Sequence, residues 1–166
     1  FLQNELQDAW ESTIESATSL LKLHKDKIVL PVDVAANVEE NRIDINVEKL
    51  PIHAPLFDMG LASILALSSR IKSAGTIILN GPAGVFELPD FALGTIEMLN
   101  ACAESSGYAV MGGGHTATLV SQRGLASKMG HVSTGGGACL DYIAGRTLPG
   151  IEALEISAQR YQLEIT

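Results

Sequence analysis

Three glycine-rich stretches are the part of this sequence best suited to chemistry. They are Asn80-Gly-Pro-Ala-Gly84, Gly112-Gly-Gly-His-Thr116 and Gly135-Gly-Gly137, and each follows a short apolar run. Glycine lets the backbone turn sharply and lets its N–H groups approach a ligand with no Cβ between them. A helix that begins behind such a turn adds a partial positive charge, which favours a phosphate group. The pattern therefore predicts anion binding by main-chain amides.

The elements that must position these stretches alternate between strand and helix. Apolar runs at Thr76–Asn80, Tyr108–Met111 and His131–Thr134 predict strands that are buried on both faces. Segments with helical character follow them at residues 91–105, 117–122 and 138–144. This order predicts an α/β fold, with a Rossmann-like open parallel β-sheet and helices on both faces. Since strand-to-helix turns of such a sheet share one edge, we expect the glycines to line one crevice.

A purely structural role for the glycines is the alternative, because glycine also serves tight connections and a bare glycine motif is weak. The chain has neither G-x-x-x-x-G-K-[ST] nor G-x-G-x-x-G, so it is not a P-loop protein and the case for a dinucleotide is weakened. No Lys or Arg lies within the three stretches. Phosphoryl transfer requires cations over the developing charge. The stretches therefore offer backbone dipoles without those cations.

The first part of the chain contains a predicted helix and a predicted strand. Apolar residues recur at helical spacing over Asn4–Leu23. The run Lys27–Val34 predicts a strand covered on both faces, with Asp33 near its carboxyl edge. There Asp33 either faces a ligand or caps a turn. Residues 35–55 predict a polar excursion with one or two short strands.

Two more helices complete the predicted elements. One spans Leu61–Lys72, with Asp58 as its N-cap or first-turn carboxylate. The other is the final helix, Pro149–Thr166. No internal linker interrupts the chain, so residues 1–166 are expected to form a single domain.

Composition excludes several classes of function. The 166 residues are 46% apolar and 18% charged, which indicates a folded domain rather than a disordered chain. The net charge of -8 argues against nucleic-acid binding, and no apolar run is long enough to span a membrane. Two cysteines in apolar surroundings predict a reduced, cytoplasmic protein. The four histidines are far apart in sequence, so no metal ligands are predicted.

At this point the sequence resembles the phosphoglycerate kinase family. The resemblance rests on motifs whose order and spacing match the family's carboxyl-terminal, nucleotide-binding domain, and it covers nearly the whole chain. These motifs are Lys27–Asp33, Asp58-Met-Gly60, Asn80–Glu87, Gly112–Thr116, His131–Ala138 and Leu148-Pro-Gly150. The resemblance implies a phosphotransferase with a carboxyl group as acceptor, which uses ATP/ADP and Mg²⁺. It would transfer a phosphoryl group between 1,3-bisphosphoglycerate and ADP in glycolysis and gluconeogenesis.

The resemblance also assigns site residues. Those expected to contact the nucleotide are Asn80, Gly81, Pro82, Val85, Glu87, Gly113, Gly114, His115 and Thr116. Within this set, Glu87 matches the residue that holds the ribose hydroxyls, although from the residues alone the Val85–Glu87 loop can equally pack on a core. Gly114 and Gly137 match the glycines whose N–H groups stabilise the transferring phosphoryl, and are the expected catalytic positions.

One departure from the family lies at His115. Many members carry Asp there as a Mg²⁺ ligand, and Gly112-Gly-Gly-His-Thr116 resembles the archaeal-type variant. A neutral imidazole is a poorer ligand than a carboxylate for a hard cation. We therefore expect Mg²⁺ to be held mainly by phosphates and water.

The other departure is length. The family's N-terminal domain, which binds 3-phosphoglycerate, has no counterpart here, nor do the first strands of the nucleotide domain with their catalytic lysine. The chain is thus expected to be most of a carboxyl-terminal domain, truncated at its N-terminal side and inactive alone. A non-catalytic nucleotide-binding α/β module is the alternative, and an α/β domain without any ligand is a third possibility.

Overall fold

The structure, a computed structural model, describes residues 7–161. They fall into two units, which divide between Pro31 and Val32. The first unit holds helix α2, Gln7–His24, on which Ile14 and Leu21 are exposed. The helix predicted from Asn4 is thus found, and its first three residues lie outside the described part. The single domain predicted over residues 1–166 stays a prediction.

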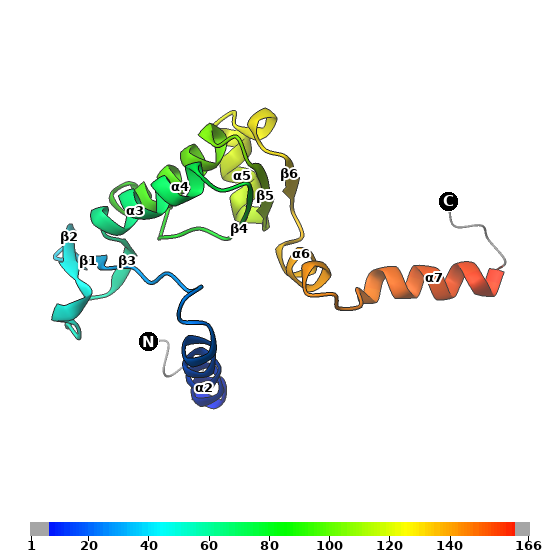
Figure 1. Ribbon diagram of the computed structural model, residues 1–166, viewed down its shortest axis with the longest axis horizontal. Helices are drawn as coiled ribbons and strands as arrows, with labels where there is room; N and C mark the ends of the chain where they lie inside the picture. Colours follow the sequence, from blue (N-terminus) through cyan, green and yellow to red (C-terminus); the bar gives the residue numbers. More distant parts are fainter. Residues whose placement is uncertain (1–6, 162–166) are drawn as a thin grey trace. The chain divides into compact units, whose positions relative to one another are not determined.

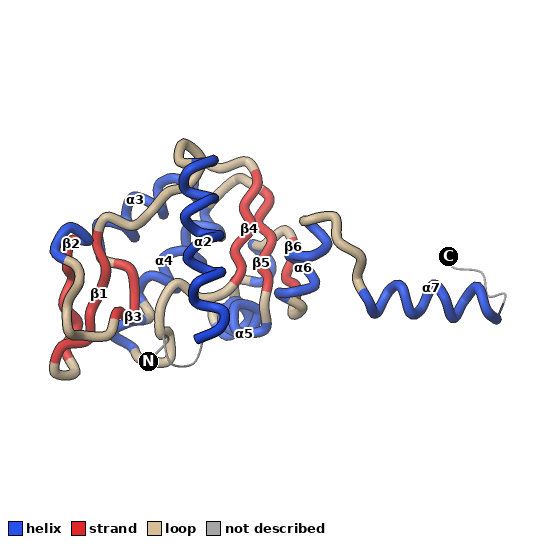
Figure 2. The backbone as a smooth tube through the Cα atoms, turned by 90° about the horizontal axis from the view of Figure 1, so that it is seen from below, coloured by secondary structure: helices blue, strands red, loops and turns tan. Residues whose placement is uncertain are grey.

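The second unit contains two three-stranded sheets (Figures 1 and 2). One is antiparallel with the order β2-β1-β3, and the other is parallel with the order β4-β5-β6. The strands are β1 Asp33–Val38, β2 Asn41–Asn46, β3 Leu56–Met59, β4 Thr76–Asn80, β5 Tyr108–Gly112 and β6 His131–Ser133. The parallel sheet confirms the predicted α/β class and the three strands that precede the glycines.

Helices connect and cover these strands. The α-helices of this unit are α3 Leu61–Lys72, α4 Leu93–Glu104, α5 Gly114–Gln122, α6 Gly136–Ile143 and α7 Pro149–Tyr161. Three short 3-10 helices are η1 Val47–Lys49, η2 Pro89–Phe91 and η3 Ala126–Lys128. The last five residues of the predicted final helix lie outside the described part. No helix among residues 7–161 combines the length and hydropathy that crossing a bilayer requires.

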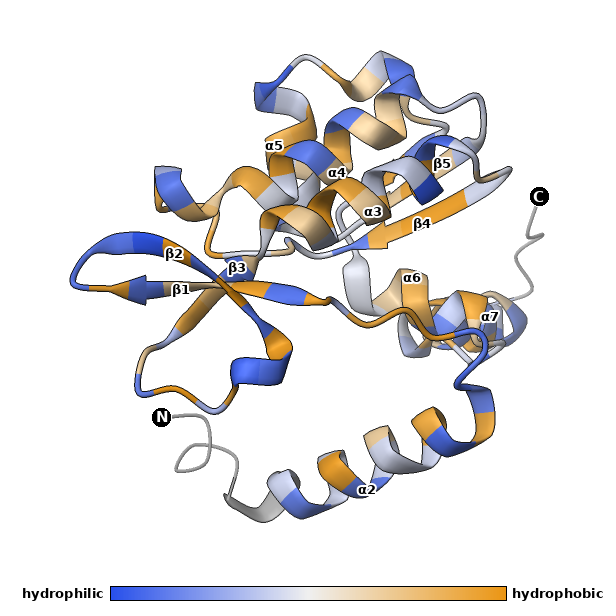
Figure 3. Ribbon diagram, turned by 60° about the vertical axis from the view of Figure 1, so that its left-hand side comes forward, coloured by the Kyte–Doolittle hydropathy of each residue, from blue (hydrophilic) through white to orange (hydrophobic). Residues whose placement is uncertain are grey.

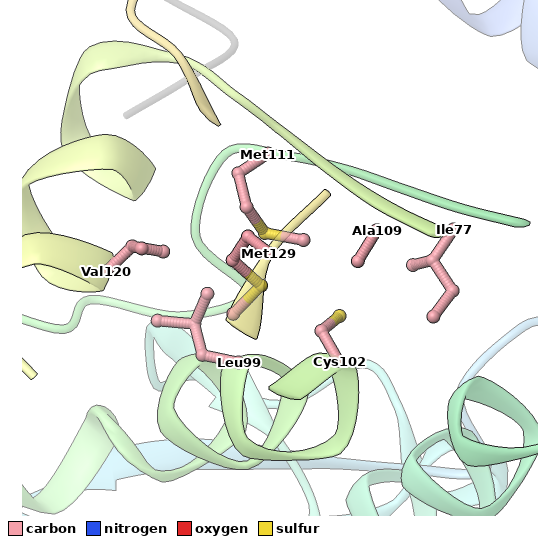
Figure 4. Packing of buried hydrophobic residues seen from close by; sticks show 7 residues of the cluster. All are labelled: Ile77, Leu99, Cys102, Ala109, Met111, Val120 and Met129. Atoms are coloured by element: carbon pink, nitrogen blue, oxygen red, sulfur yellow. The ribbon is translucent and has the colours of Figure 1, made fainter. Parts of the chain in front are cut away.

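The core lies between one face of the parallel sheet and helices α4 and α5 (Figure 4). Alternation along a strand sends every second side chain to the same face. The buried set is Ile77, Leu99, Cys102, Ala109, Met111, Val120 and Met129. Strand β4 is hydrophobic along most of its length (Figure 3), because its two faces both carry apolar side chains.

Helix α6 lies against the opposite face of the parallel sheet and leaves a hollow of about 600 Å³. This hollow is lined mainly by apolar groups, including Ile78 and Val110 from the strands and Tyr142 from α6. Ile78 is 47% exposed and Tyr142 is 72% exposed. Helices therefore flank both faces, as predicted, but they bury one face far better than the other.

The strand predicted over Lys27–Val34 is wrong. Residues 28–32 have no regular secondary structure, and strand β1 begins only at Asp33. A strand exists only where a neighbour satisfies its hydrogen bonds. The partners of β1 are supplied by the hairpin to β2 and by β3, both antiparallel, and they pair residues 33–38 rather than the apolar run.

The cap predicted for α3 is also wrong. The hydrogen bonds of the Asp58 carboxylate go to Arg42, Met59 and Gly94, and not to the first turn of this helix. Instead Asp33 accepts hydrogen bonds from the N–H groups of Ala62 and Ser63, at 2.9 and 2.8 Å, and Asp44 accepts one from Leu61 at 2.8 Å. Burial acts to raise the pKa of Asp33, but the hydrogen bonds from Ser63 and Ala62 outweigh it and hold that pKa below its usual value. Of the two roles predicted for Asp33, ligand contact and capping, the structure therefore supports capping.

Candidate functional site

The three glycine turns lie together at one edge of the parallel sheet. Asn80 is in register with Gly112, and Gly112 is in register with Ser133, so the carboxyl ends of the strands are aligned. Two further backbone hydrogen bonds join the turns: Gly81 N–H donates to Gly112 O at 3.3 Å, and Gly113 N–H donates to Ser133 O at 3.0 Å. The shared edge that the sequence predicted is present.

The turn after β5 is shaped by Gly113, whose φ is +99°. Residues with a side chain rarely adopt that backbone conformation, so glycine suits this position. Gly113 is the N-cap residue of α5, and Gly114, His115 and Thr116 form its first turn. Their N–H groups are among those that a helix start leaves without an intrahelical partner. This turn therefore has the geometry for binding an anion.

Thr116 links this turn to the loop after β4. Its side chain is buried, and its Oγ1 accepts a hydrogen bond from Gly81 N–H at 3.2 Å. His115 is exposed, and its ring lies 5.9 Å from the ring of Phe86 in the same loop. The first and second turns are thus connected through both a buried hydroxyl and a contact between rings.

The third turn packs directly against the other two. A Cβ placed on Gly136 would lie 2.9 Å from both Asn80 Oδ1 and Gly113 Cα. Real Cβ atoms essentially never come so close to a neighbour that cannot move, so Gly136 is required by packing. The start of α6 is therefore pressed against the ends of β4 and β5.

Gly114 and Gly137 differ from Gly136, because packing does not require either of them. A Cβ on either residue would meet nothing within 4 Å, and neither residue has a positive φ. Beside Gly114 lies a hollow of about 450 Å³, which also touches Thr134. The two positions predicted to be catalytic therefore face open space at the sheet edge.

The loop after β4 is held by residues that lie away from the sheet edge where the three glycine turns meet, which we call the glycine edge. The N–H groups of Ala83 and Gly84 donate to Thr95 Oγ1 at 3.0 and 3.3 Å, and Val85 N–H donates to Phe57 O at 2.7 Å. Pro82 and Glu87 are exposed, whereas Val85 is half-buried. Of the residues predicted for this loop, Asn80 and Gly81 lie at the shared edge, and Pro82, Val85 and Glu87 follow them in the loop. No pattern in the sequence indicates the supporting role of Thr95.

Comparison with known proteins agrees with this geometry. The family model of phosphoglycerate kinase matches residues 3–146.

The chain belongs to the phosphoglycerate kinase family.

The phosphoglycerate kinases that it resembles are considerably longer than this chain. It is 44% identical over 154 residues to phosphoglycerate kinase 2 of Methanosarcina acetivorans, which covers 92% of this chain and 37% of that protein. It is 42% identical over 166 residues to the phosphoglycerate kinase of Methanococcus maripaludis, with 97% of this chain and 39% of that protein covered. The chain therefore spans about two-fifths of the length of these relatives.

A solved structure supports the same membership. The crystal structure of phosphoglycerate kinase from Pyrococcus horikoshii matches with a TM-score of 0.80 and 32% sequence identity, over 92% of this chain and 38% of that one. The fold described above is therefore found within a larger phosphoglycerate kinase.

The glycine edge offers few ligands for a metal ion. Among residues 10–161, no three His, Cys, Asp or Glu side chains lie close enough together to hold one. His115 brings an imidazole to the edge, whereas Mg²⁺ prefers oxygen ligands in an octahedral arrangement. The side chains at this edge therefore fit a Mg²⁺ ion that arrives with most of its ligands already supplied by phosphate and water.

Proposed function

We propose that this chain supplies the nucleotide-binding part of a phosphoglycerate kinase, which transfers a phosphoryl group between 1,3-bisphosphoglycerate and ADP. The observation that supports this proposal is the joint position of the three glycine turns, with Gly114 and Gly137 facing open space at their shared edge. Amides gathered in this way favour a polyphosphate, because several N–H dipoles converge on one anion.

Different residues would contact different parts of the nucleotide. Asn80, Gly81, Pro82 and Val85 would lie along it, and Glu87, which is exposed, would accept hydrogen bonds from the ribose hydroxyls. The nucleotide would thus follow the loop after β4, from the sheet edge outwards.

The phosphates would bind at the starts of α5 and α6. Gly113, Gly114, His115 and Thr116 would receive the outer phosphates, and the N–H groups of Gly114 and Gly137 would stabilise the transferring group. Thr116 Oγ1 accepts a hydrogen bond from Gly81 and its side chain is buried, so it would hold the loop after β4 against the turn that receives the phosphates. Mg²⁺, bound with the nucleotide, would neutralise part of the phosphate charge.

The other substrate lies beyond these residues. We infer that recognition of 3-phosphoglycerate and 1,3-bisphosphoglycerate, and the lysine that acts on the transferring group, belong to parts of the longer relatives that this chain does not match. The glycine turns themselves contain no Lys or Arg. The chain alone would therefore bind a nucleotide weakly, or not measurably, and would not transfer phosphoryl groups.

Two glycine substitutions test the proposed site. Gly114→Ala and Gly137→Ala add a methyl group where the free chain has room, so folding should be preserved. Each methyl would stand between the amides and the phosphate and should weaken Mg·ADP binding by about tenfold, the equivalent of one charge-assisted hydrogen bond. Gly75→Ala is the matched control, since Gly75 is equally unconfined but precedes β4 at the opposite end of the sheet.

Weak binding is best followed by amide chemical shifts during a Mg·ADP titration. To provide the segments that the chain lacks, the same substitutions should also be made in a chimera. In it, this chain replaces the matching part of the Methanosarcina acetivorans relative, and both ADP binding and kinase activity are measured. Unchanged ADP binding in both glycine variants of the chimera would contradict the proposed site.

A nucleotide-binding module without transfer activity is the second candidate. The absence of Lys and Arg from the turns favours it, because binding needs only the amides whereas transfer needs cations. A chimera that binds ADP tightly yet does not turn over would support this second candidate. A chimera with normal turnover would support the kinase.

A further inference from the structure

The loop Ala83–Val85 is held by a hydroxyl group of α4 and a carbonyl group of β3, both away from the edge where the glycine turns meet. All three of its amides are engaged, two with the Thr95 hydroxyl and one with the Phe57 carbonyl. Thr95 is only 2% exposed, so its hydroxyl does not exchange these partners for water without cost. The conformation of the loop therefore depends on where β3 and the start of α4 place these two acceptors.

The start of α4 is in turn held by Asp58 of β3. The Asp58 side chain is fully buried, and its Oδ2 accepts a hydrogen bond from Gly94 N–H at 2.9 Å. The N-cap residue of α4 is Ala92, whose side chain has no acceptor, and its first turn has no acidic residue. Asp58, on strand β3, therefore caps the start of α4, a role that a side chain just before the helix normally has.

The carboxylate also sets how closely the loop approaches. A Cβ on Gly84 would lie 2.6 Å from Asp58 Oδ1, and a Cβ on Gly94 would lie 2.2 Å from the same oxygen. Both glycines thus allow the backbone to close on the carboxylate, one from the loop and one from the helix. Asp58 stands between the two segments and fixes their separation.

Arg42 of β2 makes this buried carboxylate tolerable. Its guanidinium lies 2.9 Å from Asp58 Oδ2 and also donates to the carbonyl oxygens of Met59 and Asp90, both at 2.8 Å. A second ion pair, 3.0 Å long, joins Arg42 to Asp44. A buried charge without a partner is strongly destabilising, so Asp58 needs Arg42. Of these four contacts, three lie within the antiparallel sheet, and the one to Asp90 O fixes that sheet against the residues just before α4.

We propose that Asp58, supported by Arg42, is a positioning residue for the nucleotide. It places Thr95, and through Thr95 it holds the Ala83–Val85 loop in the conformation that presents the edge to the ligand. Asp58 does not touch the nucleotide itself. This inference rests on the proposed function, because the loop matters for ADP only if the nucleotide lies along it.

The test compares substitutions that differ by one hydroxyl group. Thr95→Val removes the acceptor and keeps the shape, whereas Thr95→Ser keeps the acceptor. Ser63→Ala is the matched control, since Ser63 is equally buried and its hydroxyl also accepts from two amides, those of Val32 and Asp33. Asp58→Asn keeps the size of the side chain and removes its charge.

Amide hydrogen exchange in the chain reports the loop directly. In Thr95→Val and Asp58→Asn, the amides of Ala83–Val85 should exchange about tenfold faster than in the unmodified chain, as expected for the loss of one hydrogen bond. The amides of Ala109 and Met111 in β5 serve as the internal reference and should not change. Thr95→Ser should restore slow exchange, and Ser63→Ala should leave this loop unaffected.

A Mg·ADP titration of the same variants, made in the chimera with the Methanosarcina acetivorans relative, tests the link to the ligand. Thr95→Val and Asp58→Asn should raise the dissociation constant about tenfold, while Thr95→Ser and Ser63→Ala should leave it unchanged. If the unmodified chimera binds ADP and its Thr95→Val variant binds it equally well, or if exchange in the loop does not accelerate, the positioning role is wrong. If neither the unmodified chain nor the chimera binds ADP, the proposed function itself is wrong, and the positioning role is wrong with it.

Discussion

Asp33 and Asp58 show how one residue type serves two helices from a distance. Each lies on a strand of the antiparallel sheet, and each accepts hydrogen bonds from the start of a helix that follows later in the chain. Local capping rules look for the acceptor just before the helix. Both helices instead use a carboxylate from elsewhere, so these caps also join the sheet to the helices.

Replacing Asp33 should reveal its cap as a pH-dependent contribution to stability. Asp33→Ala should lower the free energy of unfolding by about 1 kcal/mol at neutral pH, as is usual for a lost N-cap. The pKa of Asp33 is lower in the folded chain than its ordinary value of 3.8, so the folded state favours the carboxylate. This stabilisation is present above about pH 4 and is lost as the pH falls through the folded pKa.

Urea unfolding at a series of pH values measures this effect. The difference between the unmodified chain and Asp33→Ala should be constant near neutral pH and should shrink below about pH 4. Asp33→Asn is the control, because it keeps one acceptor oxygen but cannot titrate. A difference that stays constant down to the lowest accessible pH would contradict the assignment.

The two cysteines should differ in reactivity. Burial raises the pKa of the Cys102 thiol to about 11, whereas Cys139 is only half-buried. Since the thiolate is the reactive form, a thiol reagent at pH 8 should modify one cysteine of the folded chain quickly and the second only on unfolding. The variant Cys139→Ser should show no fast reaction, and two fast thiols in the folded chain would disagree with the burial of Cys102.

At the scale of elements, the glycine turns combine two requirements. Gly136 is confined by the backbone of the second turn, whereas its neighbour Gly137 is not. Gly136→Ala should therefore destabilise the chain by about 1–3 kcal/mol through overpacking. Gly137→Ala should be neutral or slightly stabilising, since alanine is the better helix former.

Chemical denaturation of these two neighbouring variants makes the comparison. Both changes add the same methyl group to the first turn of α6, so helix propensity affects them alike. Equal stabilities would mean that the third turn does not press on the other two, and the shared edge would then be wrong.

The parallel part of the fold was open to prediction from sequence. Strands β4, β5 and β6 are short apolar runs, each followed by glycine, and both the period of the pattern and the turn chemistry indicate the same elements. In the antiparallel part, the short strand predicted within residues 35–55 is found as β2, Asn41–Asn46, but the hairpin that pairs it with β1 was not predictable. The hairpin between β1 and β2 turns at Glu39 and Glu40, which both have positive φ. Asn or Gly usually occupies such positions, so the sequence carries no turn signal there.

The candidate site was predictable to the same extent. Its glycines lie on the predictable sheet, and their shared edge follows from the parallel topology. The supporting residues Arg42, Asp58 and Thr95 were not predictable, because their ion pair and hydrogen bonds are tertiary contacts between residues 12 to 36 positions apart in the sequence. Periodicity within one element carries no information about them.

At the scale of the whole molecule, the chain matches only part of its relatives. It spans 37% of its Methanosarcina acetivorans relative, and the second face of its parallel sheet is open, with Ile78 and Tyr142 exposed. An exposed apolar surface of this kind usually marks a place where more protein packs. In the proposed enzyme, the binding site for 3-phosphoglycerate and the catalytic lysine would likewise come from other segments.

The isolated 166-residue chain should therefore be inactive. In an assay that couples phosphoryl transfer from 1,3-bisphosphoglycerate to ADP, its rate should not exceed that of the reaction without protein. The chimera with the Methanosarcina acetivorans relative is the positive control. Substantial turnover by the isolated chain would mean that the catalytic groups lie within residues 1–166 after all.

The Arg42–Asp58 ion pair has a consequence for protein engineering. A designer who wished to alter nucleotide preference would naturally transplant the segment 80–87 alone into another scaffold. That graft would lack the Asp58 carboxylate, the Thr95 hydroxyl and the Phe57 carbonyl, which hold the backbone of the segment in place. The smallest transferable module therefore runs from Arg42 to Thr95, and a shorter insert should arrive in the wrong conformation.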